Sequence, residues 1–434
     1  AEVQSSDAKS DLEWQGMQMF VDNGVAEDDP RMSAVYEHFE GNLRDIVDTL
    51  NAKGMHVVLS TVPVNLRQSA PFLSIGRDGL SVSDEAKLTA LRERAEAQAL
   101  NGRWREAQDL WQQAIALDAG YADSHFQLAT SLENLGELAL ARSHYERALD
   151  LDGLRFRADT RINAIIERVA REYDSSNVSF VHSSKGFDRA SAPYAPGWDL
   201  LVEHVHYDFS GNAVLARIFA RAIARHLSPT TPPKLLQPEE VAARIGFPNH
   251  ETIENLKNLQ GMAKQPPFPG QSNYQDYLAF LATELSSITA EVGEPKDVVR
   301  RRQQVLVDGE GDWKLHFEMT ALARHLKNKQ AQYYHLDQLF KLYPHNRESY
   351  INLATLLSQD GRWAEVIPLL ERSLSYTRGR DELVVEAVGW LGTAHLKTGN
   401  TAKATELLLS IPEDYPDQIG MSLRAYGNLI KHSS

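Results

Sequence analysis

The chain has no cysteine among its 434 residues, which excludes disulfide bonds and thiolate metal sites. It also has no apolar run of about 18 residues, the length that a membrane-spanning helix needs. Positive charge is in deficit, because 45 lysines and arginines stand against 59 acidic residues and give a net charge of −14. This balance argues against a nucleic-acid-binding protein, which would carry a basic stripe. The one compact basic cluster, residues 300–302, is interpreted as an exposed helix face.

A nucleotide-binding glycine loop and a recognisable signal peptide are also lacking, which argues against kinases and NTPases. What is present is ordinary globular material, with 42% hydrophobic and 24% charged residues. The length allows about two to four domains. The chain begins at Ala1 without an initiator methionine, so we expect a processed or truncated product with any anchor upstream.

A period of 34 residues links two neighbouring segments. Small residues, aromatic residues and leucines recur at this distance, which is typical of the tetratricopeptide repeat, where small residues lie at the crossing of paired helices. The period predicts two helical hairpins over residues 83–153. The pairs are Gly102 with Gly136, Ala107 with Ala141, Trp111 with Tyr145, Ala114 with Ala148, Leu117 with Leu151, and Asp118 with Asp152.

The pattern returns near the C-terminus. Gly361 and Gly399 each follow a small residue by seven positions and precede a leucine by nine, and a more degenerate unit covers residues 315–344. We predict a helical solenoid over residues 312–434. Solenoids of this kind usually bind peptides on their concave face, so a protein or peptide partner is expected.

A different pattern surrounds the first repeats. Residues 35–50 have the periodicity of an amphipathic helix and residues 56–62 read as a buried strand. After the repeats come a helix at 161–171, a strand at 178–181 and a helix at 213–224. The arrangement predicts one α/β layer domain interrupted by a helical insertion. A proline-rich linker at 228–233 and helices at 238–257 and 274–292 follow.

An acid and a histidine three residues apart, Glu203 and His206, precede Gly211 and the helix at 213–224. A carboxylate can orient and charge an imidazole, and the imidazole can deprotonate a hydroxyl nucleophile. The alternative interpretation is an ordinary polar first turn of a helix, where such pairs are common.

A metal site is a second alternative for the same stretch. His204, His206 and Asp208 alternate, so on an extended strand they would share one face. A fourth ligand is not identifiable, and we expect neither a metal nor a cofactor.

The run Glu203-x-x-His206 with Gly211 resembles the last motif of the SGNH, or GDSL-type, hydrolases, with Glu in place of their usual Asp. Residues 57–67, 70–72 and 157–163 are similar to a strand, its following loop and the next helix of bacterial SGNH proteins that carry tetratricopeptide repeats. The resemblance covers about residues 11–227 and matches the order of the predicted elements.

The resemblance implies a serine ester hydrolase or acyl transferase, with His206 as the base and Glu203 orienting it. Its substrates would be esters, such as acyl groups on a carbohydrate or lipid. The family's serine, glycine and asparagine motifs precede the helix at 35–50 and match nothing here; Ser5 and Ser6 lack a preceding strand and a glycine. We expect the nucleophile upstream of Ala1 and an inactive isolated chain. A membrane-anchored, extracytoplasmic bacterial location is implied, with a cytoplasmic location as the alternative.

Asn65 and Arg67 follow the end of a buried strand, where α/β proteins place ligand-contacting loops. They are predicted to line the substrate pocket, and the alternative is a loop amide beside a surface arginine.

The predicted fold is α/β plus all-α: a partial SGNH-like three-layer α/β domain, interrupted by a tetratricopeptide insertion and followed by a solenoid. The predicted boundaries are 1–82, 83–153, 154–228, 229–311 and 312–434. Two functions follow from this organisation. The chain is either the C-terminal part of a hydrolase, supplying the acid–histidine pair, or a non-catalytic scaffold that binds partner proteins. Neither nucleic acid nor a membrane span in this chain is expected.

Overall fold

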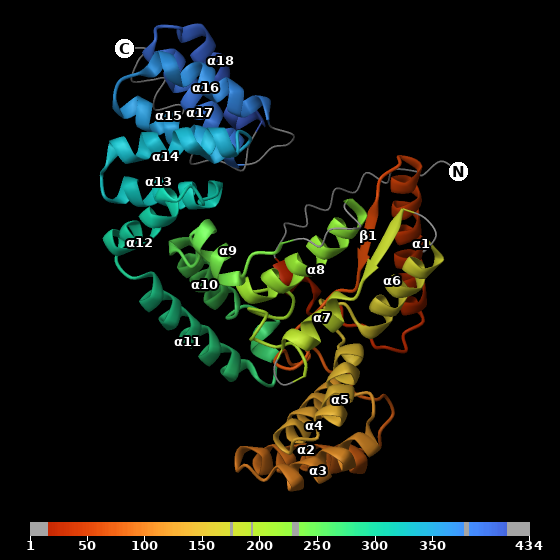
Figure 1. Cartoon of the computed structure of the whole chain (residues 1–434). Coiled ribbons are helices and arrows are strands. Elements are labelled where there is room, and N and C mark those ends of the chain that lie inside the picture. Colours follow the sequence, from red (N-terminus) through yellow and green to blue (C-terminus); the bar gives the residue numbers. More distant parts are fainter. Residues whose placement is uncertain (1–15, 174–176, 192–193, 228–233, 377–381, 415–434) are drawn as a thin grey trace. The chain divides into compact units, whose positions relative to one another are not determined.

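A computed structural model of the chain describes residues 16–173, 177–191, 194–227, 234–376 and 382–414 (Figure 1). These residues are mostly helical, with eighteen α-helices and two β-strands. Contacts divide the chain into unit 1, Ala1–Pro238 with Glu254–Ser287, and unit 2, Glu239–Ile253 with Ile288–Ser434. None of the described helices has the length and apolar character needed to cross a membrane. Ser5, Ser6 and the predicted linker at 228–233 lie outside the described residues.

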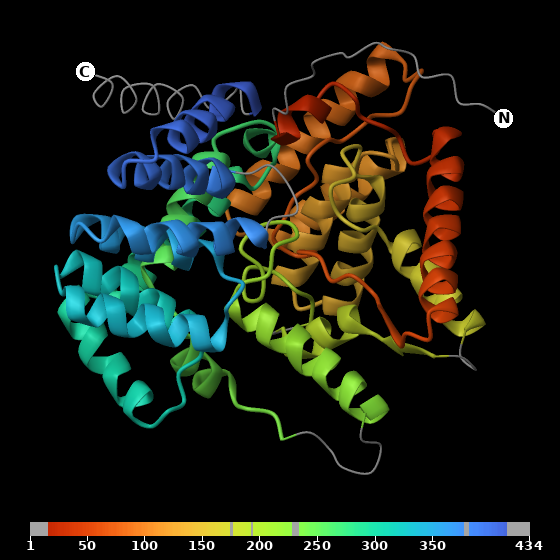
Figure 2. The same ribbon diagram turned by 90° about the horizontal axis from the view of Figure 1, so that it is seen from above.

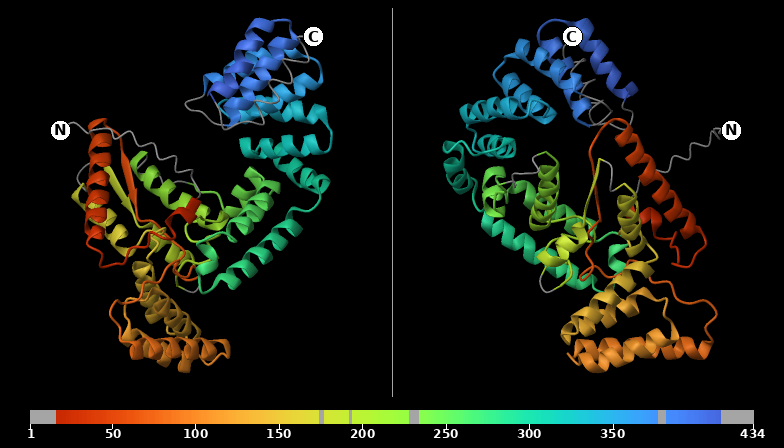
Figure 3. Two further views of the ribbon diagram at one scale, coloured as in Figure 1. Left: turned by 180° about the vertical axis from the view of Figure 1, so that it is seen from behind. Right: turned by 45° about the vertical axis from the view of Figure 1, so that its right-hand side comes forward.

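Two parallel strands form the centre of the α/β part of unit 1. β1 (Val57–Ser60) and β2 (Val178–Val181) pair along their whole length. α1 (Arg31–Ala52) and α6 (Thr160–Glu172) pack against each other and against the strands. α8 (Phe209–Leu227) contacts the strands from the other side (Figures 1 and 3). The strands are rich in apolar, β-branched residues, which suits a buried parallel pair.

The helices on this sheet share an apolar core. Asp159 caps α6 by accepting a hydrogen bond from the amide of Ile162 at 2.9 Å, and it also accepts one from the hydroxyl of Tyr36 on α1. Every helix and strand that the sequence predicts around the repeats is present, while their assignment to an SGNH-like domain stays a prediction. The buried core residues are Met32, Tyr36, Val47, Val57, Leu59, Ile165, Ile166, Val169, Ala170 and Val178.

The segment between β1 and α6 folds into two helical hairpins. α2 (Val82–Leu100) packs on α3 (Trp104–Leu117), and α4 (Ala122–Asn134) packs on α5 (Leu138–Leu151). α3 also packs on α4, so the two hairpins form one block.

The alanines and aromatic residues that carry the 34-residue period lie in the core of this block, and its glycines lie in the turns. Gly102 and Gly136 occupy equivalent turns at φ 70° and 79°, a region that glycine enters without a Cβ clash. Trp111 and Tyr145 are 1% and 2% exposed. Small residues at the helix crossings are also buried, which lets the helices approach closely. They are Ala95, Ala107, Ala114, Ala129, Ala141 and Ala148.

Short elements complete the polypeptide between the two repeat blocks. α7 (Ser183–Ala190) follows β2, and α11 (Tyr274–Val292) matches the helix predicted there. The helix predicted over 238–257 is instead two helices, α9 (Pro238–Ile245) and α10 (His250–Met262). That prediction is wrong because Gly246 has a positive φ of 74° and Pro248 follows it, so the first helix ends there. Two 3-10 turns lie at Gly16–Phe20 and Phe268–Gly270.

Unit 2 contains three further hairpins in tandem. A Cβ added to Gly392 would lie 2.6 Å from a carbon of Leu408, so the small residue is required by helix packing, and Ala354 at the equivalent place is fully buried. The helices after α12 (Pro295–Val307) pack on their neighbours in chain order, as Figure 2 shows in cyan to blue. They are α13 (Trp313–His325), α14 (Lys329–Leu342), α15 (Arg347–Gln359), α16 (Trp363–Ser375), α17 (Glu382–Lys397) and α18 (Thr401–Asp414).

The predicted exposure of the basic cluster at 300–302 is wrong for one member. The side chain of Arg302 is only 12% exposed, and its Nε lies 3.6 Å from a carboxylate oxygen of Glu318. Arg302 also donates a hydrogen bond to the carbonyl of Pro248 at 2.9 Å. It therefore belongs to the packing between α12 and α13.

Candidate functional site

Glu203 and His206 lie on a tight loop that immediately precedes α8. The amide of Val202 donates to the carbonyl of His206 at 2.9 Å, which closes the loop. The carboxylate of Asp208 then accepts from the amide of Gly211 at 2.6 Å in the first turn of α8. The interpretation of the pair as part of a helical turn is therefore wrong, because both residues come before the helix.

The carboxylate of Glu203 binds the ring of His206 directly. Nδ1 of His206 donates to Oε1 at 2.6 Å, and the same oxygen accepts from the amides of Val205, at 3.1 Å, and His206. The Glu203 side chain is 1% exposed, whereas that of His206 is 77% exposed. With Nδ1 engaged, Nε2 is left accessible, as a general-base histidine requires.

The charge state of Glu203 suits this role. Burial alone would raise the pKa of the carboxyl, but hydrogen bonds and charge from His204 and His206 outweigh burial and lower the pKa to about 2. The group is therefore ionised at neutral pH and can hold the His206 ring in the form protonated on Nδ1.

Asn65 forms hydrogen bonds to the backbone of the loop that carries Glu203 and His206. It is fully buried, and its Nδ2 donates to the carbonyl of Glu203 at 3.0 Å while its amide donates to the carbonyl of His204 at 3.0 Å. Its Oδ1 accepts from the amide of Gln68 at 2.9 Å. Both polar atoms of this side chain thus bond to backbone within the protein, Nδ2 to Glu203 and Oδ1 to Gln68.

Arg67 connects the same loop to the inserted hairpins. Its side chain is 14% exposed and lies 3.2 Å from Glu133 of α4 and 3.3 Å from Asp199. It also donates to the carbonyl of Ala195 at 3.3 Å. The structure thus brings Asn65 and the Glu203 loop together, and places Arg67 between that region and the repeats.

A cavity of about 260 Å³ opens where β1 and β2 end. Polar residues reach it from the loops after both strands and from α5 and α6, among them Thr61, His182, Arg142 and Asn163. The carboxyl ends of parallel strands are the usual place for a ligand. Asn65, Arg67, Glu203 and His206 do not line this cavity, so the assignment of the first two to a substrate pocket stays a prediction.

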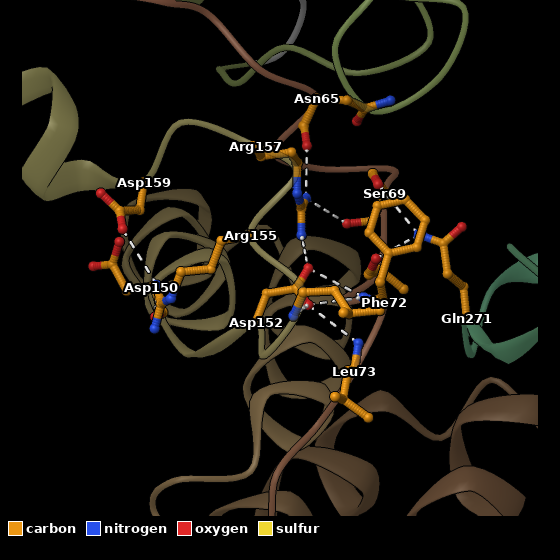
Figure 4. Close-up of polar contacts among 12 residues, drawn as sticks. Asn65, Ser69, Phe72, Leu73, Asp150, Asp152, Arg155, Arg157, Asp159 and Gln271 are labelled. Atoms are coloured by element: carbon orange, nitrogen blue, oxygen red, sulfur yellow. Dashed lines mark hydrogen bonds and ion pairs between the residues drawn. The ribbon is translucent and has the colours of Figure 1, made fainter. Parts of the chain in front are cut away.

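A buried ion pair connects the end of the inserted hairpins to the loop that carries Asn65 (Figure 4). Arg157 donates to Asp152 at 3.1 Å, and to the carbonyls of Asn65 at 2.9 Å and Ser69 at 2.7 Å. Asp152 also accepts from the amides of Phe72, Leu73 and Leu154 at 3.1 to 3.2 Å. The residues that follow α5, the last helix of the inserted hairpins, therefore bind the loop that carries Asn65.

Residues far along the chain complete the surroundings of the pair, and the sequence did not predict them. His204 is 6% exposed and is enclosed by the rings of Phe72, Phe156 and Phe268. The hydroxyl of Tyr277 is buried, and this burial, reinforced by the charge of Glu203, raises the pKa of the hydroxyl. The one local signal is the phenylalanine between prolines at 266–269, an apolar residue in a loop.

The same distant segment contacts the second inserted hairpin. The Ser272 hydroxyl donates to Asp123 and accepts from Nε2 of Gln127 at 2.9 Å, and both partners are on α4. The neighbouring Gln271 donates to the carbonyl of Ala70 at 2.5 Å. Part of the surface of α4, the first helix of this hairpin, is therefore occupied by Ser272.

The three candidate metal ligands do not converge. Nδ1 of His204 lies against Oε2 of Glu203, while Asp208 caps α8 and His206 is exposed. Within the described residues, no group of three or more histidine, aspartate or glutamate side chains could hold a metal ion.

Comparison with known proteins supports the helical repeats. The tetratricopeptide repeat family model matches residues 349–382, which cover most of α15 and all of α16. The predicted tetratricopeptide-like repeat is confirmed over these residues. No curated protein matches the sequence.

Several solved structures are similar to this chain at low identity. YrrB, described as a TPR protein with an unusual peptide-binding site, is 14% identical over 48% of this chain and 98% of its own, with a TM-score of 0.30. The TPR2AB domain of yeast Sti1, solved in a complex with pHSP90, is 14% identical over 81% and 100%, with a TM-score of 0.25. The Cut9–Hcn1 structure is 13% identical over 80% and 72%, with a TM-score of 0.28.

Proposed function

We propose that this protein is a tetratricopeptide scaffold that binds a protein or peptide partner through the first helices of its unit 2 hairpins. The observation that carries the proposal is the tandem of three hairpins over 313–414, with the family match at its centre. Stacked hairpins of this type present an extended concave surface that binds peptides.

Side chains on the first helices of these hairpins act on one another. Arg324 of α13 donates to Asn352 of α15 at 3.0 Å. Burial raises the pKa of Glu348 on α15; the charge of Arg324 opposes this shift, and those of Glu251 and Glu386 reinforce it. Groups from α13, α15 and α17 therefore lie near one another, and Glu348 is only partly shielded by them, so its side chain is still open to solvent. Since α4 is contacted by Ser272, the unit 2 surface is the better candidate for a partner.

Selection of a displayed random-peptide library on the full chain tests this function. Enriched peptides are expected to bind in solution by isothermal titration calorimetry, and Glu348→Arg is expected to weaken them at least tenfold. Glu371→Arg on α16 is the matched control, because it makes the same charge reversal on the second helix of the hairpin. Failure to enrich any peptide, or equal loss in both variants, would count against the scaffold function.

A second function, ester hydrolysis or acyl transfer of the SGNH type, is favoured by one specific observation. Glu203 is buried and ionised, and it holds Nδ1 of an exposed histidine at 2.6 Å. Loops after β1 and β2 surround this region, in an α/β layer interrupted by the repeats. In this proposal residues 1–82 and 154–228 belong to the hydrolase domain, and the serine is supplied by polypeptide outside this sequence. No hydroxyl is hydrogen-bonded to the His206 ring within the described part of the chain.

The second function is tested on the polypeptide as its native source produces it. Its intact mass is expected to exceed 48.6 kDa, and it is expected to hydrolyse p-nitrophenyl acetate while the 434-residue chain does not. His206→Ala should lower kcat by orders of magnitude. His38→Ala, an exposed histidine on α1, should leave kcat unchanged. Near-normal turnover after His206→Ala would refute the assignment of His206 as the catalytic base.

A further inference from the structure

The carboxylate of Glu203 contacts two histidines, one on each oxygen. Oε1 accepts from the ring of the exposed His206 at 2.6 Å and from two backbone amides. Oε2 lies against Nδ1 of His204 as an ion-pair contact, and neither of these two buried atoms has a hydrogen-bond partner. The side chains of Glu203 and His204 are 1% and 7% exposed, so water does not replace that contact.

His204 is held in a fixed orientation by aromatic edges. Its ring lies 5.0 Å from that of Phe72 at 86°, 5.8 Å from that of Phe268 at 67°, and 6.3 Å from that of Phe156 at 69°. The amide of Asn65 donates to its carbonyl at 3.0 Å, which fixes the backbone. Turning the ring away from Glu203 would drive it into packed side chains.

The contact also controls the charge of Glu203. A buried carboxylate oxygen without a partner is costly, and burial alone raises the pKa of this group. His204 is the largest influence that lowers the pKa, ahead of His206. A hydrophobic residue in place of His204 would fill a similar volume but would remove the ion-pair contact of the buried Oε2.

We propose that His204 is a positioning residue, which binds Oε2 of Glu203 from its aromatic enclosure and thereby keeps Oε1 aligned to hold His206 with Nδ1–H inward and Nε2 free. This inference rests on the second proposed function, since it concerns the acid–histidine pair.

Histidine tautomers measured by long-range 1H–15N NMR test the inference without any catalytic activity. In the full chain labelled with 15N-histidine at pH 7.5, His206 is expected to be protonated on Nδ1, and its signals are identified by their loss in His206→Gln. In His204→Leu they should shift to the Nε2–H form that dominates in free imidazole side chains. His204→Asn places an N–H near the position of Nδ1 and should restore the Nδ1–H form, whereas His204→Gln should not. The signals of His38 should stay unchanged throughout.

The outcomes separate the inference from the function on which it rests. If His206 is locked on Nδ1 in the unmodified chain and stays so in His204→Leu, the positioning role is overturned while the pair stands. If His206 is not locked in the unmodified chain, the acid–histidine pair itself fails. Should His204→Leu not fold, the comparison of the Asn and Gln variants decides, since equal behaviour of the two overturns the inference.

Discussion

Arg157 and Asp152 form an ion pair at 3.1 Å although their side chains are only 2% and 3% exposed. The pair is satisfied on almost every side, because Arg157 also donates to two backbone carbonyls and Asp152 accepts from three backbone amides. A buried charge pair is tolerated when hydrogen bonds replace the lost hydration in this way. The pair joins the end of the inserted hairpins to the loop that supports Glu203.

Arg157→Met is expected to lower the free energy of unfolding of unit 1 by about 3 kcal/mol, because it leaves Asp152 buried without its charge partner. Urea denaturation of the full chain measures the loss. Arg168→Met is the control, since the Arg168 side chain is 52% exposed in its pair with Glu40. Its effect should be much smaller than that of Arg157→Met, because an exposed ion pair contributes little to stability. Equal effects would show that the buried pair has no special role.

Glu318 predicts a loss of stability in unit 2 as the pH rises. Burial raises its pKa from 4.5 to about 7, although the charges of Arg302 and Arg301 oppose the shift. Between these values the folded state keeps a proton that the unfolded state has released, so stability falls from pH 4.5 to pH 7 by roughly 3 kcal/mol and then levels off. Denaturation of the chain and of Glu318→Gln at several pH values gives the difference. A difference that does not change with pH would contradict the assignment.

His335 is expected to make the stability of unit 2 rise with pH, which is the opposite of the effect of Glu318. Burial, helped by the charge of His316, lowers its pKa to about 4, and the Nδ1 atoms of the two rings are 3.0 Å apart. The unfolded state binds the proton first, so this contribution to stability is complete above pH 6.5 and is lost, by roughly 3 kcal/mol, as the pH falls towards 4. His335→Gln should flatten that part of the profile. An unchanged acid limb in this variant would refute the prediction.

Alanine substitutions at two glycines of α17 are expected to change the stability of unit 2 in opposite directions. Gly392→Ala puts a Cβ 2.6 Å from a carbon of Leu408 and should destabilise unit 2 by about 1 to 2 kcal/mol. Gly389→Ala meets only Ile411, at 3.8 Å, and should stabilise the helix by up to about 1 kcal/mol. Thermal midpoints of the two variants check the contrast, and midpoints that shift in the same direction would disprove the packing argument.

The arrangement of helices and strands was predictable where local periodicity decides it. α11 and β2 lie where the sequence predicts them, and the 34-residue period identified the glycine turns and the buried Trp111 and Tyr145. The break between α9 and α10 was missed because the helical pattern continues through Gly246. A single residue at positive φ interrupts it, and periodicity averages over such residues.

The candidate site was predictable only in its local part. The spacing of Glu203 and His206 indicated the contact that the structure shows. The role of His204 depends on Phe72 and Phe268, which are distant along the chain, and no local spacing encodes that enclosure. The hydrogen bond from Asn65 to the backbone of the Glu203 loop was not predicted, because it joins residues 138 positions apart, and the assignment of Asn65 to a substrate pocket stays a prediction.

The fastening of the insertion by Asp152 has a consequence for the order of folding. β1 and β2 can pair only after residues 61–177 have brought the chain back on itself, and the entropy lost in closing a flexible loop grows with its length. α2 to α5 make mainly local contacts, which form quickly. Once they have folded, Asp152 joins the entry at Phe72 to the exit at Leu154, and the loop left for the sheet to close is short. We therefore expect the inserted repeats to fold before β1 and β2 pair.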